Sequence, residues 1–256
     1  IGGNILEKSS YKYSKFGMYC AKLGRRNLEE CITNLVMEDG SFSQHSSTYH
    51  RFVLDTLVQV ELWRLWLNLP SFSNDFLSKC KKAIYWLKYF IDPISGDVPN
   101  LGNNDGVFCY QLHTLPYRDF RPTIQLSSLL FDGNNPVERG PWDEQLNWIS
   151  LPSESISKYV NKSYSSSKRR LISTQNDIKL FKEGGYLICR ISDYSWSLMR
   201  LPIYKFRPVH ADPLHFDLWY KGQNILRDAG TYSYNSSEQD LKYFSSIRSH
   251  NTIQFD

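Results

Sequence analysis

The sequence predicts an α+β protein in which a helical part comes first and a part built of antiparallel strands follows. Apolar residues recur at helical spacing through the first two-thirds of the 256 residues, and they alternate with polar residues beyond residue 170. Because helices and strands are segregated along the chain, the pattern favours separate layers over an alternating α/β fold. Successive helices joined by loops indicate an α/α bundle or toroid.

Three helices are predicted most directly. Residues 26–37 repeat Leu28, Ile32 and Leu35 on one face. Apolar residues cover so much of the circumference at 48–69 that we expect this helix to be buried between neighbours, ending before Pro70. The next helix begins near Asn74, a residue type that caps helix N-termini well. Shorter helices are expected at 121–131 and 142–149, after a loop at 92–106 that is rich in Gly, Pro, Asn and Asp.

The strands follow a Ser- and Lys-rich stretch at 153–170, which has little periodicity and is typical of a linker. It predicts a helical domain over 1–165 and a β domain over 166–256. Strands are expected at 186–192, 195–203 and 214–220, and the Gly184–Gly185 pair predicts a turn before the first of them. The chain opens on Ile1 and ends in an extended segment, and we interpret it as truncated at both ends.

Charge and hydropathy narrow the classes of partner. The net charge of +4 is mild and no long basic run exists, so nothing indicates nucleic-acid binding. The charge is compatible with an acidic polymer as ligand. No run of 18 apolar residues predicts a transmembrane helix.

Residues 207–256 collect an unusual density of titratable side chains in what we expect to be one β-rich unit. Three of the six histidines of the chain, His210, His215 and His250, fall here, and they lie among Asp, Tyr and Arg side chains. A purely structural sheet has no need of such a cluster. The segment is therefore the first place where we expect chemistry.

Two groups of motifs in this chain resemble the heparinase II/III family of polysaccharide lyases. The first is His-Ala-Asp at 210–212, Asp-x-Gly-Thr-Tyr at 228–232 and Arg-x-His-Asn-Thr at 248–252. The second is EDGSFSQHSSTYHRFVLD at 38–55, where an acidic-Gly loop leads into a Tyr-His pair. The resemblance implies an α/α toroid, incomplete here, followed by an antiparallel β-sandwich, with the active site in the cleft between them. It also implies the periplasm or cell surface of a bacterium.

The resemblance assigns an acid/base role to Tyr49, which we predict at the N-terminal end of a helix. A helix N-terminus favours nearby negative charge and can lower a tyrosine pKa from about 10, which would suit proton transfer. The alternative is that Tyr49 is only the first core residue of the helix. His50 either assists it or hydrogen-bonds the preceding loop.

The resemblance implies a structural zinc ion held by His210, Asp228 and His250. Two imidazoles and a carboxylate are a reasonable zinc set, although separations of 18 and 22 residues match no compact zinc motif. The alternative is that the three side chains make ordinary hydrogen bonds at strand ends.

Further candidates would bind or process the substrate. Tyr232 and Tyr234 point to one face of an extended segment, where one of them could be a second proton shuttle or a sugar-stacking platform, or the pair could simply fill a sheet face. Asn104 and Asp105 could recognise hydroxyl groups or belong to a solvated turn. His215 could replace a family histidine whose position holds Pro208, or it could face outward from a strand. Gln44 and Arg248 complete the candidate substrate-binding residues.

The leading prediction is a polysaccharide lyase that cleaves a uronate-containing acidic glycan, such as a glycosaminoglycan or alginate, by β-elimination. The family's Asn-His pair, which neutralises the substrate carboxylate, would lie upstream of Ile1. Pro208, Gln44 and Thr48 depart from the family pattern and favour an alternative, a catalytically weakened glycan-binding or surface-polysaccharide assembly protein. No pair of carboxylates indicates a hydrolase.

Overall fold

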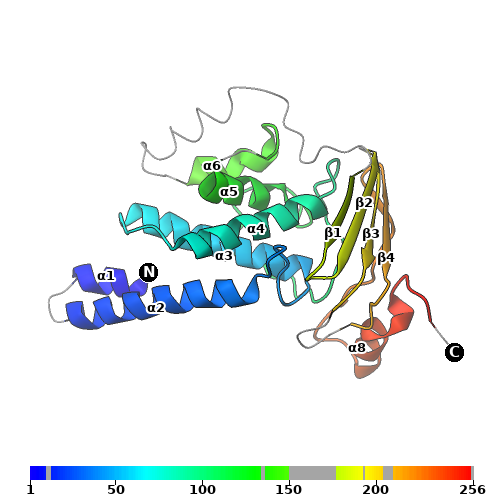
Figure 1. Ribbon diagram of the computed structural model, residues 1–256, viewed down its shortest axis with the longest axis horizontal. Coiled ribbons are helices and arrows are strands. Elements are labelled where there is room, and N and C mark those ends of the chain that lie inside the picture. The colour runs from blue at the N-terminus through cyan, green and yellow to red at the C-terminus, as the bar shows by residue number, and fades with distance from the viewer. Residues whose placement is uncertain (10–12, 134–135, 150–176, 193, 204–209, 255–256) are drawn as a thin grey trace.

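A computed structural model describes residues 1–9, 13–133, 136–149, 177–192, 194–203 and 210–254. Within them a helical part is followed by an antiparallel sheet that stands across one end of the helices (Figure 1), so the predicted α+β class is confirmed. The predicted linker, the boundary between residues 165 and 166, and Pro208 lie outside the described residues.

The helical part begins with an antiparallel hairpin that extends away from the sheet (Figure 1). Its members are α1 (Gly2–Ser9) and α2 (Ser14–Leu35), and the remaining helices are α3 (Ser47–Trp66), α4 (Asn74–Phe90), α5 (Arg121–Asp132), the 3-10 turn η2 (Pro141–Asp143) and α6 (Glu144–Trp148). Buried residues lie on all sides of α3, as predicted, since α3 packs against α4 and α5. Helix α4 is capped by Ser73 rather than by Asn74, because the Ser73 hydroxyl accepts the Phe76 N–H.

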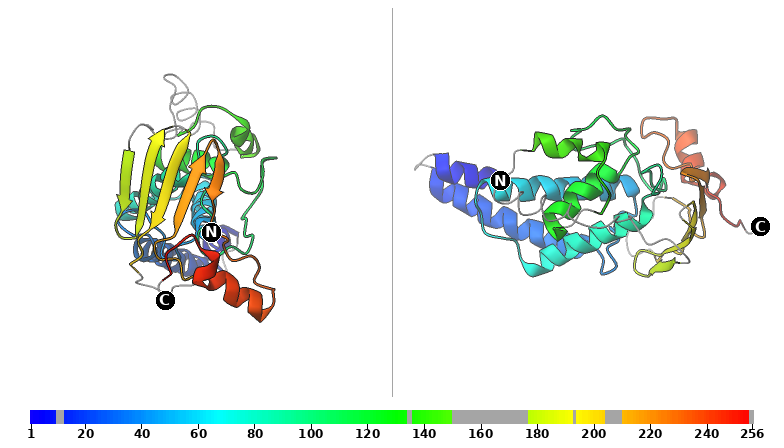
Figure 2. Two further views of the ribbon diagram at one scale, coloured as in Figure 1. Left: turned by 90° about the vertical axis from the view of Figure 1, so that its right-hand side faces the viewer. Right: turned by 90° about the horizontal axis from the view of Figure 1, so that it is seen from above.

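The sheet is a simple meander. Its strands are β1 (Asp177–Phe181), β2 (Tyr186–Ser192), β3 (Ser195–Arg200), β4 (Phe216–Tyr220) and β5 (Gln223–Leu226), and each pairs antiparallel with the next (Figure 2, left). The turn at Gly184–Gly185 is confirmed, with Gly185 at a φ of +70°. The segment 207–256 is not wholly β-rich as predicted, because α8 (Glu238–Ser245) and the 3-10 turn η3 (Ile247–Ser249) lie in it.

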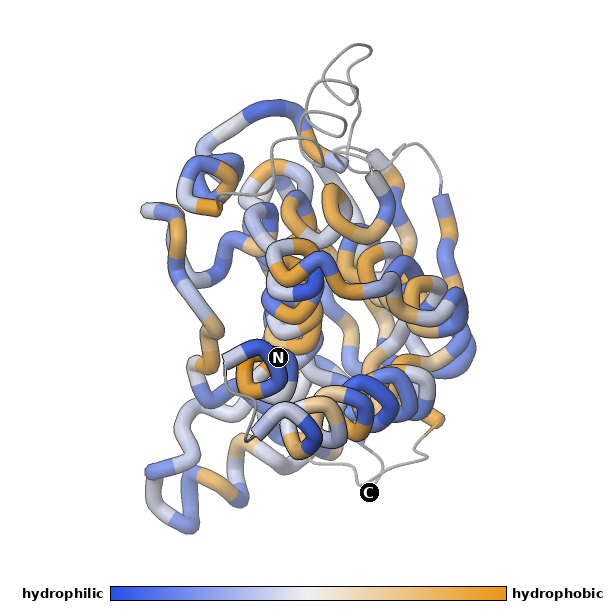
Figure 3. The backbone as a smooth tube through the Cα atoms, turned by 90° about the vertical axis from the view of Figure 1, so that its left-hand side faces the viewer, coloured by the Kyte–Doolittle hydropathy of each residue, from blue (hydrophilic) through white to orange (hydrophobic). Residues whose placement is uncertain are grey.

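Aromatic side chains join the helices to the inner face of the sheet in a single core. The rings of Trp86 and Phe90 on α4 stack on each other, and Phe90 meets Phe181 of β1 and Tyr186 of β2 at centroid distances of 5.7 and 5.2 Å. Hydrophobic residues accordingly gather toward the middle of the molecule (Figure 3). This shared core fixes the sheet against the ends of the helices.

The outer face of the sheet is also apolar, but it is exposed. Leu180, Leu187, Met199 and Phe216 lie opposite one another across β1 to β4, and Ile178 on the same face is 70% exposed. A sheet with apolar side chains on both faces is typical of a layer inside a sandwich. Among the described residues no second sheet covers this face.

The loop at 38–46, which precedes α3 in the sequence, bonds the helical part to the sheet. The Asp39 carboxylate accepts the N–H groups of Glu183 and Gly184 in the β1–β2 turn, at 2.7 and 3.0 Å. At the other side of the junction, the buried Arg190 guanidinium donates to the carbonyls of Tyr89 and Ile91, at the C-terminal end of α4. The N-terminus of α3 is thereby placed at the boundary between helices and sheet.

Candidate active site

The start of α3 is anchored on both sides of Tyr49. Ser46 is the N-cap, and its hydroxyl accepts the Tyr49 N–H at 3.1 Å while donating to the carbonyl of Asn103 at 2.6 Å. Ser47 donates to the carbonyl of Pro99 at 2.7 Å. The N-cap that begins the helix therefore also fixes the loop at 99–106 beside it.

The Tyr49 hydroxyl is brought to two other segments of the chain. It donates to Asp105 Oδ2 at 2.9 Å and lies 3.5 Å from the hydroxyl of Tyr234, which comes from the sheet part. Burial, the Tyr234 hydroxyl and the Asp105 carboxylate all raise the pKa of Tyr49. The prediction of a lowered pKa was wrong, because burial and these two neighbours all favour the protonated hydroxyl.

A polar cavity of about 620 Å³ lies next to this group, at the junction of the helical and sheet parts. This size falls in the range of small-ligand sites. Its lining combines amides, hydroxyls, one carboxylate and two guanidinium groups, from Asn100, Asn104, Asp105, Tyr117, Arg118, Arg227, Thr231, Tyr232, Tyr234 and Asn235. The cavity thus brings together four of the predicted residues, Asn104, Asp105, Tyr232 and Tyr234. It lies between the helical and sheet parts, where the resemblance implies a cleft.

Two arginines that line the cavity, Arg118 and Arg227, are not predicted by the sequence motifs. Arg118 is held by Asp97 Oδ1 at 2.7 Å and Asn100 Oδ1 at 3.1 Å. Arg227 is exposed, and no described residue bonds its guanidinium. Neither arginine belongs to a spacing pattern, although Arg227 directly precedes the Asp-x-Gly-Thr-Tyr motif.

Three predicted residues lie elsewhere. His50 is buried, with Nε2 2.9 Å from the carbonyl of Ala83 and its ring stacked on Trp86, so it bonds α4 rather than the preceding loop and does not reach the Tyr49 hydroxyl. Gln44 and Arg248 are exposed, and neither lines the cavity.

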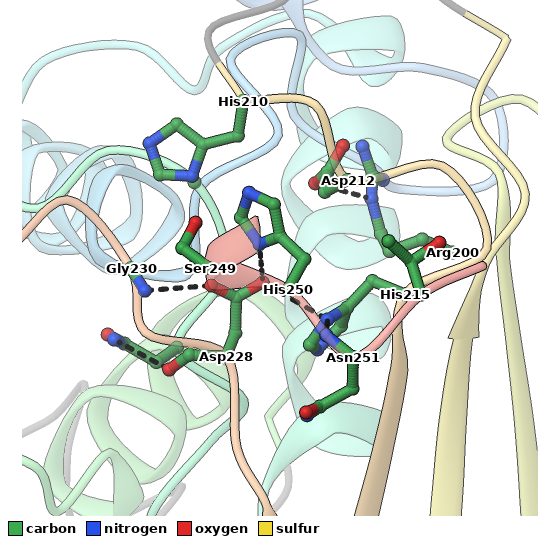
Figure 4. A network of polar contacts seen from close by, with 12 residues as sticks. Arg200, His210, Asp212, His215, Asp228, Gly230, Ser249, His250 and Asn251 are labelled. Atoms are coloured by element: carbon green, nitrogen blue, oxygen red, sulfur yellow. Dashed lines mark hydrogen bonds and ion pairs between the residues drawn. The ribbon is translucent and has the colours of Figure 1, made fainter. Parts of the chain in front are cut away.

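His210, Asp228 and His250 converge in a buried cluster (Figure 4). One potential ligand atom from each residue lies within 4.8 Å of the others. His250 Nδ1 is 3.0 Å from Asp228 Oδ2, and Asp228 Oδ1 accepts the N–H of Gly230 at 2.7 Å. The three residues are 18 and 22 positions apart in the sequence. They lie together because the segments that follow β3, β5 and α8 meet at this point.

The cluster fits a metal ion by a criterion that is independent of spacing. His210 Nδ1 and His250 Nε2 are both buried, and neither has a hydrogen-bond partner among the described residues. Leaving such a nitrogen unpaired is costly, and a metal ion would satisfy it. Burial lowers the pKa of His210, so its imidazole is neutral and available as a ligand near neutral pH.

His215 differs from both expectations for it, since it faces neither outward nor the cavity. It has no exposed surface, and it contacts Asp217 through Nε2 at 3.0 Å. Its Nδ1 accepts the N–H of Asn251 at 3.0 Å and lies 3.5 Å from Asp228 Oδ2 (Figure 4). His215 therefore lies beside the carboxylate of the cluster, held in place by Asp217 and Asn251.

Comparisons with known proteins agree with this arrangement. Residues 173–256 match the family described as heparinase II/III-like, C-terminal. A heparin-sulfate lyase of Bacteroides thetaiotaomicron is 22% identical over 98% of this chain and 36% of its own length.

Solved structures are similar in fold. A crystal structure of heparinase III superposes with a TM-score of 0.60 at 18% identity, covering 98% of this chain and 37% of that protein. A heparan sulfate lyase from Pedobacter heparinus gives 0.59 at 16% identity, covering 97% and 35%. This chain therefore spans about a third of the length of these relatives.

The fold of the described residues is therefore similar to the corresponding part of these solved structures. The predicted resemblance is confirmed: residues 173–256 match the heparinase II/III-like C-terminal family, and the chain is similar to a heparin-sulfate lyase and to heparinase III.

Proposed function

We propose that this protein is a polysaccharide lyase that cleaves an acidic, uronate-containing glycan by β-elimination. The observation that carries the proposal is the position of the Tyr49 hydroxyl, which bonds Asp105 and approaches Tyr234, two residues that line the polar cavity. The similarity to a heparin-sulfate lyase supports a glycosaminoglycan as the substrate class.

β-Elimination needs two proton transfers. A base removes the proton on C5 of the uronate, its electron pair forms the C4–C5 double bond, and the C4–O bond breaks as an acid protonates the departing oxygen. The raised pKa keeps Tyr49 protonated, so its hydroxyl is suited to the acid step. Tyr234, 3.5 Å away, can pass a proton to it. In this proposal Tyr49 is the main proton donor, and Tyr234 assists it as the tyrosinate that takes the C5 proton before passing it to Tyr49.

Arg227 supplies positive charge for an acidic substrate, and Arg118 adds a second guanidinium group whose charge Asp97 partly balances. Arg118 enters from the helical part and Arg227 from the end of β5, and both line the cavity. Guanidinium groups bind carboxylates and sulfates with charge-assisted hydrogen bonds. Asn104 offers its amide to sugar hydroxyls in the same cavity.

His210, Asp228 and His250 would hold a structural zinc ion. Two imidazoles and a carboxylate suit zinc better than calcium or magnesium, which prefer oxygen ligands. When bound, the ion would supply a positive charge and a cross-link between three segments of the sheet part. In this proposal the chain comprises part of an α/α toroid (1–165) and part of a β-sandwich (166–256), whose second sheet would cover the exposed outer face.

We place the protein in the periplasm or at the surface of a bacterium, where such glycans are met. Among the described residues, none of the helices combines the length and apolarity that a membrane crossing requires. Fractionation of the source cells would test the location.

The test is substitution of Tyr49 by Phe. Incubation with heparan sulfate, heparin, hyaluronan and alginate, followed by the ultraviolet absorbance of the unsaturated uronate, should show cleavage by the native protein. Tyr49→Phe should lose about 10²- to 10⁴-fold in rate, the usual contribution of a general acid or base. Tyr194→Phe, in the exposed turn between β2 and β3, is the matched control. Full activity in Tyr49→Phe would contradict the proposal, and binding without any unsaturated product would favour the glycan-binding alternative.

A further inference from the structure

Tyr232 and Tyr234 both line the polar cavity, but their side chains make different contacts. The Tyr234 hydroxyl faces Tyr49, whereas no described residue bonds the hydroxyl of Tyr232. The Tyr232 side chain is 69% exposed and lines the polar cavity. An exposed tyrosine at the edge of a polar cavity is placed to contact a ligand rather than to fill a core.

One face of the Tyr232 ring is backed by a second aromatic ring. The rings of Tyr232 and Phe244 stack with centroids 5.0 Å apart and an interplanar angle of 14°. Phe244 belongs to the last turn of α8, where Tyr243 packs edge-on against it at 5.3 Å. This support holds the Tyr232 ring in one orientation and leaves its other face to solvent.

The backbone of Tyr232 is also held in an uncommon conformation. Its φ is +62°, in the left-handed region that non-glycine residues rarely adopt. The preceding residue is fixed to the helical part, since the Thr231 hydroxyl donates to the carbonyl of Gly102 and accepts the N–H of Asn104, at 3.2 and 3.3 Å. Strain of this kind persists where the surroundings determine the conformation, and here it orients the ring beside the cavity.

We propose that Tyr232 is a sugar-stacking platform, backed by Phe244, that binds a ring of the glycan next to the one at Tyr49. The inference rests on the proposed function and deepens it. A pyranose ring presents C–H groups on one face and hydroxyls around its edge. The open face of Tyr232 matches the C–H face, and Asn104, Arg118 and Asn235 of the cavity can bond the edge. Helix α8 would therefore serve to position Phe244 behind the platform.

The experiment is calorimetric titration with size-defined oligosaccharides of the four glycans above, in a Tyr49→Phe background that keeps them intact. Tyr232→Ala should weaken binding about tenfold, as expected for loss of one aromatic stacking contact. Tyr232→Phe should restore the affinity to within about twofold of the parent, because the ring and not the hydroxyl makes the contact. Phe244→Ala, which removes the backing ring, should weaken binding in the same direction as Tyr232→Ala.

Tyr194→Ala removes another exposed tyrosine, on the β2–β3 turn, and should leave the affinity unchanged. Equal affinity of Tyr232→Ala and the parent overturns the platform, as does a Tyr232→Phe variant that loses as much as Tyr232→Ala. If the native protein binds a glycan, is weakened by Tyr232→Ala and forms no unsaturated product, the lyase proposal fails and the platform stands. Binding of no glycan in the panel overturns both.

Discussion

Tyr49 and Asp105 are joined by a hydrogen bond of 2.9 Å although 56 residues separate them in the sequence. The bond links the first turn of α3 to the loop that follows α4. Burial and the Tyr234 hydroxyl raise the pKa of Tyr49, and the Asp105 carboxylate, which accepts this bond, raises it further. Asp105 is thereby a positioning residue for Tyr49.

Asp105→Asn should lower the pKa of Tyr49, since the amide carries no negative charge. A lyase that needs protonated Tyr49 would then lose activity at a lower pH, so the alkaline limb of the pH profile of kcat/KM should move down. Difference titration of tyrosinate absorbance, with Tyr49→Phe as the reference, measures the same shift without turnover. An alkaline limb that stays in place in Asp105→Asn would remove Tyr49 from the acid role.

Metal binding should stabilise the fold through His210 and His250. Addition of Zn²⁺ to the chelator-treated protein should raise Tm, and the rise should grow with metal concentration as binding to the folded state requires. His210→Ala should abolish the response and the bound metal. His113 is a similarly buried histidine in the helical part, outside the cluster, so His113→Ala should keep the response. A His210→Ala variant that still binds one equivalent of zinc would contradict the ligand set.

Arg200 forms a buried ion pair at 3.2 Å with Asp212, which lies two residues after His210 in the sequence (Figure 4). Arg200→Met should lower the free energy of unfolding by roughly 3–5 kcal/mol, because it leaves the Asp212 charge buried without its cation. The double variant Arg200→Met/Asp212→Asn should recover part of this loss, since the uncompensated charge is gone. Urea unfolding of both variants measures the difference. A double variant less stable than Arg200→Met would mean that packing of the guanidinium over Tyr186 dominates.

The sequence was informative where one local pattern decides the structure. The all-round apolar pattern at 48–69 predicted the buried α3, and the alternation at 186–192 gave β2 its observed bounds. By contrast, β5 (Gln223–Leu226) is a short edge strand with mostly exposed side chains, so no alternation marks it. Helix α8 carried a usable signal, since Ser237 caps it through the N–H of Asp240, but the surrounding serines concealed it.

The geometry of the candidate site depends on contacts between distant segments, which the spacing of residues in the sequence does not predict. The motifs singled out His210, Asp228 and His250, and the fold brings them together. The sign of the Tyr49 pKa shift could not be predicted, because it depends on burial of the hydroxyl and on Tyr234 and Asp105, which come from distant parts of the sequence. The different partners of Tyr232 and Tyr234 could not be predicted either. An alternating pattern places both side chains on one face, whereas Tyr232 stacks on Phe244 and Tyr234 approaches Tyr49.

Asp55, buried in α3, should make stability depend on pH. Burial raises its pKa to about 7, while the Thr123 hydroxyl and Arg51 favour the charged form to a smaller extent. Between about pH 4 and 7 the unfolded chain has lost this proton and the folded protein keeps it, so stability falls as pH rises, by about 1.4 kcal/mol per unit. The contribution is fully present below about pH 4 and is lost above about pH 7.

Asp55→Asn removes this titration and keeps an oxygen for the Thr123 hydroxyl, which donates to Asp55 Oδ1 at 2.9 Å. Relative to the native protein, the variant should therefore gain stability steadily as pH rises from about 4 to 7 and hold a constant difference above that range. Urea unfolding across this range measures the difference, and Asp75→Asn, at an exposed position on α4, controls for the change in net charge. A stability difference between Asp55→Asn and the native protein that does not vary with pH would show that Asp55 is ionised in the folded state throughout, with Arg51 outweighing the cost of burial.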